Sequence, residues 1–323
     1  MSVLIVGTVA FDTIETPWGR VERVVGGSAT YSALAASFLV PVRVAGVVGE
    51  DFTDRHFEVF WRRGIETTGV ARERGKTFFW AGRYGENPNE RETLATELNV
   101  FENFTPRLPE DYRDSRHLFL ANMAPEIQMS VLDSCVKARF SILDTMDFWI
   151  GGSREALEEA VRRVDCVLMN DGEARQFSRA SSLAGAAERI LGMGPRVVVI
   201  KKGEHGAEMF TKKSHSTVPA YPVGRLKDPT GAGDTFAGGL LGYVATAGRI
   251  GEGVLRKAMA VGTVLASFCV EEFGTGNFEN IVESDIKGRL KYLRMASRVE
   301  NVALKIRDNI SLEDEERVIK TGL

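Results

Sequence analysis

Short runs of β-branched and other apolar residues recur along the chain, and most are followed by apolar residues at helical spacing. The runs that predict strands are 3–9, 42–48, 117–121, 140–143, 166–169 and 197–200. The segments that predict helices are 28–39, 53–63, 127–136, 154–163 and 183–191. Strand and helix in alternation are typical of a parallel sheet with both faces covered. We therefore expect an α/β protein with three layers, α/β/α, around a mostly parallel central sheet.

Two segments interrupt this alternation. Residues 14–25 and 77–101 alternate apolar and polar positions, contain turn signals at Trp18-Gly19 and at 85–89, and lack helical periodicity. We interpret them together as a small antiparallel sheet, a β lid inserted twice into the larger unit. The expected division gives 1–12, 26–72 and 106–323 to the α/β domain, and 13–25 and 73–105 to the lid.

The C-terminal part predicts three further helices. Residues 234–247 and 251–270 are apolar, whereas 284–298 is basic and amphipathic. We expect the mixed-charge segment after Asn301 to be loosely held.

Composition narrows the function classes. The chain has 323 residues, with 41 Lys and Arg against 44 Asp and Glu, and it has no long run of one sign, so nucleic acid is not an expected partner. Its apolar stretches fall short of the roughly 20 residues that span a bilayer, so no membrane partner is expected either. The 3 cysteines lie far apart without a CxxC pair. This usage fits a reducing compartment and predicts a cytoplasmic protein.

The segment DPTGAGDTFAGG at 228–239 carries the strongest chemical signal. Gly231, Ala232 and Gly233 have almost no side chains, so their backbone N–H groups can approach an anion beside the positive end of the following helix. Asp234, in the first turn, can take a proton from a hydroxyl that attacks phosphorus. A glycine turn followed by a capped helix is the alternative interpretation, and for an isolated motif it is the commoner one.

The whole segment resembles the C-terminal signature of the ribokinase-like (PfkB) carbohydrate kinases. Other stretches agree with that family in order and spacing up to about residue 276. They are Gly26-Gly27 followed by SATYSALAAS, VVGEDF at 47–52, NDGE at 170–173 and IKKGEHGA at 200–207. The resemblance implies a ribokinase-like fold with a β-sheet lid. It also implies an ATP-dependent kinase that phosphorylates a hydroxyl, a primary alcohol, of a sugar or sugar derivative.

The resemblance assigns roles around the phosphates. It implies that Asp234 is the general base and that Gly231, Ala232 and Gly233 form the anion hole.

Nucleotide and cation roles follow from the same resemblance. Asn170 and Glu173 would position Mg²⁺ and the phosphates, Glu173 through water, whereas Lys201 and Gly203 would line the phosphates and ribose of ATP. Asp228 lies where relatives bind a monovalent cation such as K⁺. A helix cap at 170–173 and a solvated Lys201 are the structural alternatives.

On the acceptor side, the resemblance assigns Asp12 to the substrate hydroxyls, and a carboxylate can accept two of them. An ordinary turn acid is the alternative. Gly26 and Gly27 let the backbone pass close to the substrate. The family usually has Asn where this chain has Tyr31, so the identity of the sugar is open.

Several alternatives remain at this point. Tyr31, together with Phe79, Trp80 and Tyr84 of the lid, favours an adenosine-type nucleoside kinase in which aromatic rings stack on a base. A non-catalytic sensor of a sugar or nucleotide is an alternative from another class. Edge strands of a small lid often pair with a second copy, so a homodimer through the lid is also open.

Overall fold

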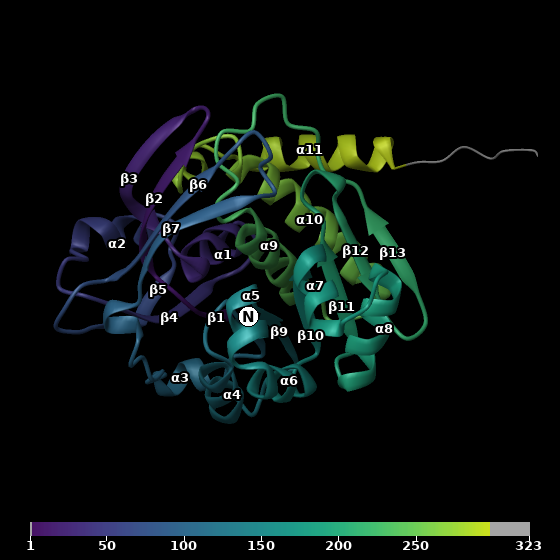
Figure 1. Cartoon of the computed structure of the whole chain (residues 1–323), viewed down its shortest axis with the longest axis horizontal. Coiled ribbons are helices and arrows are strands. Elements are labelled where there is room, and N and C mark those ends of the chain that lie inside the picture. Colours follow the sequence, from purple (N-terminus) through teal and green to yellow (C-terminus); the bar gives the residue numbers. More distant parts are fainter. Residues whose placement is uncertain (1, 298–323) are drawn as a thin grey trace, which may run out of the picture.

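The computed structural model describes residues 2–297 and shows helices on both faces of a nine-stranded sheet, with a smaller sheet to one side (Figure 1). The last residue of the helix predicted at 284–298, and the segment that follows, lie outside the described residues. Within that range, no helix combines the length and apolar character needed to cross a bilayer.

The central sheet confirms the predicted parallel core. Its order is β13-β12-β11-β10-β9-β8-β1-β4-β5. Pairing is parallel from β5 through to β11, whereas β12 and β13 are antiparallel. The strands are β1 Val3–Val6, β4 Val42–Val48, β5 Glu66–Arg72, β8 His117–Leu120, β9 Phe140–Asp144, β10 Cys166–Asn170, β11 Val197–Lys201, β12 Ala207–Phe210 and β13 His215–Val218.

Each face of this sheet has its own hydrophobic core. Adjacent β1 residues point to opposite faces: Ile5 joins the cluster under α1, α9 and α10, and Leu4 joins the cluster under α4, α6 and α8. The helices are α1 Ser28–Ser37, α2 Asp54–Trp61, α3 Glu110–Arg113, α4 Pro125–Ser134, α5 Asp147–Gly152, α6 Arg154–Arg163, α7 Asp171–Ser178, α8 Leu183–Met193, α9 Ala232–Thr246, α10 Glu252–Cys269 and α11 Glu283–Ala296. Short 3₁₀ turns occur at η1 Asn99–Phe101, η2 Gly203–His205 and η3 Gly276–Glu279.

Helices α1 and α9 pack unusually closely. A Cβ on Gly238 of α9 would lie 2.0 Å from the carbonyl oxygen of Ser32 on α1, so a larger side chain has no room. This contact holds the N-terminus of α9 at the carboxyl edge of the central sheet, the edge where parallel α/β folds place their ligands.

The second sheet contains β3 Gly19–Gly26, β2 Ala10–Thr16, β6 Phe78–Tyr84 and β7 Arg91–Glu97, in that order. The expectation of a wholly antiparallel sheet is wrong, because β2 pairs with β6 in parallel. Both strands follow parallel strands of the central sheet and leave its carboxyl edge in the same direction. The structure also ends the predicted first strand at Val6 and places Asp12 in the second sheet.

Candidate active site

A cavity of about 1730 Å³ lies between the carboxyl edge of the central sheet and the second sheet. It brings together most of the residues that the sequence singled out. Those that line it are Asp12, Gly27, Tyr31, Asn170, Glu173, Lys201, Gly203, Gly231, Ala232, Gly233 and Asp234. Gly26 and Asp228 are not among its lining residues.

The start of α9 forms a backbone cradle at the cavity. Gly231 caps the helix with φ of 75°, in the left-handed region that favours glycine, and a Cβ there would lie 2.3 Å from the Tyr31 ring. The Ala232 N–H donates to the Pro229 carbonyl, whereas the Gly233 N–H makes no backbone hydrogen bond to the described residues of the preceding loop. An amide that lacks an acceptor at a helix N-terminus suits an anion.

Asp234 lies in the first turn of α9 beside this cradle. The pKa of Asp234 is raised to about 7, because burial and the negative charge of Asp144 raise it more than Lys201 and Arg91 lower it. A carboxyl group that titrates near neutral pH is matched to general base catalysis. The structure therefore gives Asp234 the electrostatic character that a base requires.

Lys201, at the end of β11, is held beneath the cradle by an acid that the sequence analysis missed. Its Nζ lies 3.0 Å from a carboxylate oxygen of Asp144, at the end of β9, and 3.1 Å from the position of a Cβ on Gly233. Burial lowers the pKa of Lys201, but the surrounding acids, Asp144 first, outweigh it and the net direction is upward. The sequence did contain one signal for Asp144, because this acid directly follows the apolar run that predicts a buried strand at 140–143.

Asn170 and Glu173 form a reciprocal capping box at the start of α7. The Asn170 side chain accepts from the Glu173 N–H at 2.7 Å, and Glu173 Oε2 accepts from the Asn170 N–H at 2.7 Å. Oε1 of Glu173 has no hydrogen bond within residues 2–297. Burial raises the pKa of Glu173 to about 7, although Lys201 opposes the shift. The helix cap that was the alternative interpretation of 170–173 is therefore present. The same arrangement also places a carboxylate oxygen of Glu173 at the cavity.

Asp228 anchors the loop before α9. Its carboxylate oxygens accept from the N–H groups of Thr230 at 2.8 Å and Gly274 at 3.0 Å, and the residue is 1% exposed. In the described part of the chain, no group of three or more His, Cys, Asp or Glu side chains is arranged to hold a metal ion. The monovalent-cation role of Asp228 stays a prediction.

Asp12 reaches the cavity from the second sheet. It is 4% exposed, and its Oδ2 accepts a long hydrogen bond of 3.4 Å from the Gly27 N–H. A Cβ on Gly26 would lie 1.9 Å from the same oxygen, so the two glycines admit the carboxylate against the backbone. The pKa of Asp12 is raised to about 7, because burial and the charges of Asp228 and Asp234 outweigh the opposing hydrogen bond from Gly27.

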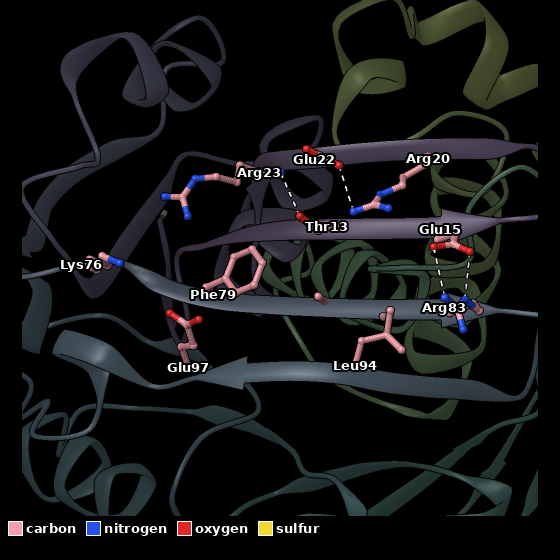
Figure 2. A pocket seen from close by; sticks show the side chains of 12 residues that line it. Thr13, Glu15, Arg20, Glu22, Arg23, Lys76, Phe79, Arg83, Leu94 and Glu97 are labelled. Carbon is pink, nitrogen blue, oxygen red and sulfur yellow. Dashed lines mark hydrogen bonds and ion pairs between the residues drawn. The ribbon is translucent and has the colours of Figure 1, made fainter.

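The aromatic residues divide between two faces of the second sheet. Trp80 and Tyr84 line the cavity, as does Tyr31, whose buried hydroxyl has no hydrogen-bond partner within residues 2–297. The stacking role suggested for Phe79 is wrong. Phe79 lies on the opposite face, near Arg23, in a separate pocket (Figure 2).

Comparison with known proteins shows the family of this chain. Residues 2–281 match the pfkB family carbohydrate kinase. The chain is 30% identical to the cytidine kinase of Thermococcus kodakarensis, over 75% of this chain and 88% of that protein. It is 27% identical to the inositol 3-kinase of Arabidopsis thaliana, over 93% and 83% respectively.

A solved structure with ATP and Mg²⁺ bound, of an E. coli protein assigned as a ribokinase II, superposes with a TM-score of 0.74 at 17% sequence identity, over 90% of this chain and 99% of that one. This likeness shows the ribokinase-like fold. The chain therefore belongs to the pfkB family of carbohydrate kinases, and it is a phosphotransferase that uses an alcohol group as acceptor.

Proposed function

We propose that this enzyme transfers the γ-phosphate of ATP to a hydroxyl group, a primary alcohol, of a sugar or sugar derivative. One observation carries the proposal: Asp234, with a pKa raised to about 7, shares a cavity with the free Gly233 amide and with Lys201. A base, an anion-binding amide and a cation are the parts that phosphoryl transfer needs.

The step balances as follows. The acceptor oxygen attacks the γ-phosphorus and forms a new P–O bond. The bond from that phosphorus to the β,γ-bridging oxygen breaks, and its electron pair leaves with ADP. The hydroxyl proton passes to the carboxylate of Asp234. The Gly233 N–H and the Lys201 ammonium stabilise negative charge on the transferred group.

The residues present fit a magnesium ion bound with the nucleotide. Mg²⁺ usually keeps several waters and takes one or two carboxylates with substrate phosphates, so a dense cluster of acids is not required. Oxygens of Asn170 and Glu173 at the cavity would hold it through water, and it would supply charge neutralisation of the phosphates.

In this proposal, Asp12 binds the acceptor substrate and the second sheet covers it. The carboxylate of Asp12 accepts hydrogen bonds from the acceptor hydroxyls, and Gly27 lets the substrate approach the backbone. The second sheet acts as a lid that excludes water, because an open site would hydrolyse ATP.

A nucleoside is the second candidate acceptor. Trp80 lines the cavity, and its six-membered ring lies against Gly82, where a Cβ would be 2.1 Å from Cη2. An indole held in this way can stack on a base. The similarity to the Thermococcus kodakarensis cytidine kinase supports the same candidate.

An acceptor panel tests the proposal. Cytidine, adenosine, ribose, fructose and myo-inositol are each incubated with ATP and Mg²⁺, and ADP and the phosphorylated product are both quantified. We expect at least one acceptor to give the two products in equal amounts. The variant Trp80→Leu should raise KM for a nucleoside more than for a free sugar. Tight sugar binding without transfer to any acceptor would instead indicate the non-catalytic sensor.

A further inference from the structure

The β6–β7 hairpin of the second sheet reaches across the mouth of the cavity, and Figure 1 shows it extending towards α9. Tyr84 and Arg91 face each other at the end of this hairpin. The Tyr84 hydroxyl lies 3.2 Å from Oγ1 of Thr230, directly before the cradle. Asn89 Oδ1 lies 2.0 Å from where a Cβ on Gly203 would be. The hairpin thus contacts both the α9 loop and the β11–β12 turn.

Arg91 brings an uncompensated charge to this mouth. It lines the cavity together with Glu173 and Asp234, and its side chain has no ion pair or hydrogen bond with any of residues 2–297. Lys201 is the other described cation that lines the cavity, and it is already paired with Asp144.

The other arginines of the second sheet behave differently. They lie around the separate outer pocket, where Figure 2 shows Arg20 paired with Glu22 and Arg83 paired with Glu15. Arg23 is paired with Asp51. Surface pairs of this kind contribute little to stability, but they show that arginines here normally find a partner.

The charge balance of the cavity indicates what Arg91 is for. Asp144, Glu173 and Asp234 are gathered where the phosphates would lie, and acids repel a phosphoryl group. The positive charge of Arg91 acts on two of these acids, because it opposes the upward pKa shifts of Asp234 and Glu173. A guanidinium presents several donors in a fixed plane that matches phosphate oxygens.

We propose that Arg91 is a catalytic residue supplied by the hairpin, which contacts the γ-phosphate of ATP and stabilises its charge during transfer. This inference rests on the proposed function. No bond to Arg91 forms or breaks: the phosphoryl group still passes from ATP to the acceptor oxygen, ADP still leaves, and the proton still passes to Asp234. Contact through the hairpin would make transfer depend on its closed position over the cradle.

Nucleotide binding provides the first test. Mg²⁺ complexes of AMP-PNP and ADP are titrated calorimetrically into wild type, Arg91→Gln and the control Arg83→Gln. A hydrogen bond to a charged group is worth about 1.5–3 kcal/mol, so Arg91→Gln should weaken AMP-PNP binding by about tenfold or more. ADP lacks the γ-phosphate and should bind within about twofold of wild type. Arg83→Gln should match wild type with both nucleotides.

Turnover provides the second test. Arg91→Ala should lower kcat by about 10²–10³-fold, the usual loss for one electrostatic contact to a transition state. Arg91→Lys should recover part of this loss, and added guanidinium ion should partly rescue Arg91→Ala. Unchanged AMP-PNP affinity in Arg91→Gln, or an equal loss for ADP, would overturn the inference while the kinase assignment stands. If wild type bound neither nucleotide, the proposed function itself would fail.

Discussion

At the scale of single residues, the site is a group of acids whose pKa values are raised towards neutral pH, with Asp12 buried and Glu173 and Asp234 partly exposed. Burial is the largest cause of the raised pKa in Asp12, Glu173 and Asp234, each about 7. Buried acids of this kind cost stability when ionised, and strongly shifted groups in a cavity are typical of functional sites.

The pKa of Asp234 gives a prediction for pH dependence. A general base must be ionised, so kcat/KM should rise with pH through about 7 and level off above about pH 8. Asp12 also has a pKa raised to about 7, and in the proposed function its carboxylate accepts hydrogen bonds from the substrate hydroxyls. The rise of kcat/KM with pH should therefore be steeper than that for a single group. A pH profile from about 5.5 to 9 measures this, and a flat profile would contradict the role of Asp234.

Asp12 gives a prediction for stability. Its folded-state pKa is raised from 3.8 to about 7, so the folded protein holds this proton more tightly than the unfolded chain does. The stability it contributes is complete below about pH 3.8 and is lost as pH rises to about 7. Asp12→Asn, which cannot ionise, should therefore increase the free energy of unfolding at pH 8 by about 1–3 kcal/mol.

Denaturant unfolding of Asp12→Asn and wild type at about pH 8 and pH 4 checks this prediction. The gain should shrink towards the acid, and acceptor binding should weaken although the protein is more stable. An equal effect at both pH values would show that the ionised carboxylate is not destabilising.

At the scale of elements, the position of Asp234 depends on how closely α9 packs against α1. Gly238→Ala places a methyl group 2.0 Å from the Ser32 carbonyl, which forces a backbone shift. Overpacking of this kind costs about 1–3 kcal/mol, so we expect a lower melting temperature. The matched control is Gly253→Ala in α10, where a Cβ meets nothing within 4 Å. Thermal unfolding of both variants should show destabilisation in Gly238→Ala alone.

Elements with local patterns were predicted well from the sequence. The apolar strands that became β4, β9, β10 and β11 differ from the expected ranges by at most one residue at either end. Strands β5, β12 and β13 were missed, because they lie at or near the sheet edges, and β5 and β13 contain exposed polar residues. The parallel β2–β6 pair joins distant segments, which periodicity cannot reveal.

The site divides in the same way. The 228–239 motif identified the cradle and Asp234 because all of its parts are adjacent in sequence. Asp144 was missed because its importance comes from Lys201, on another strand, and Arg91 was missed because a hairpin brings it to the cavity. Tyr31 was expected to contact the acceptor substrate. The structure adds that its ring packs against Gly231 of the cradle.

At the scale of the whole molecule, the cavity exists because two sheets face each other, and few contacts join them across its mouth. The Tyr84–Thr230 hydrogen bond is one of these contacts. Tyr84→Phe removes it, and a typical net contribution of about 0.5–1.5 kcal/mol predicts a 2- to 10-fold rise in acceptor KM. Closure that is less complete should also increase ATP hydrolysis in the absence of acceptor. Steady-state kinetics with and without acceptor measures both effects, and wild-type values in both assays would exclude a role in closure.

The central claim is that Asp234 removes the acceptor proton during phosphoryl transfer from ATP. Single-turnover kinetics of Asp234→Asn, with the acceptor that the panel identifies, tests it most directly. We predict that the transfer rate falls by about 10²–10⁴-fold while the affinities for ATP and acceptor stay within about threefold of wild type. A transfer rate within tenfold of wild type would contradict the account.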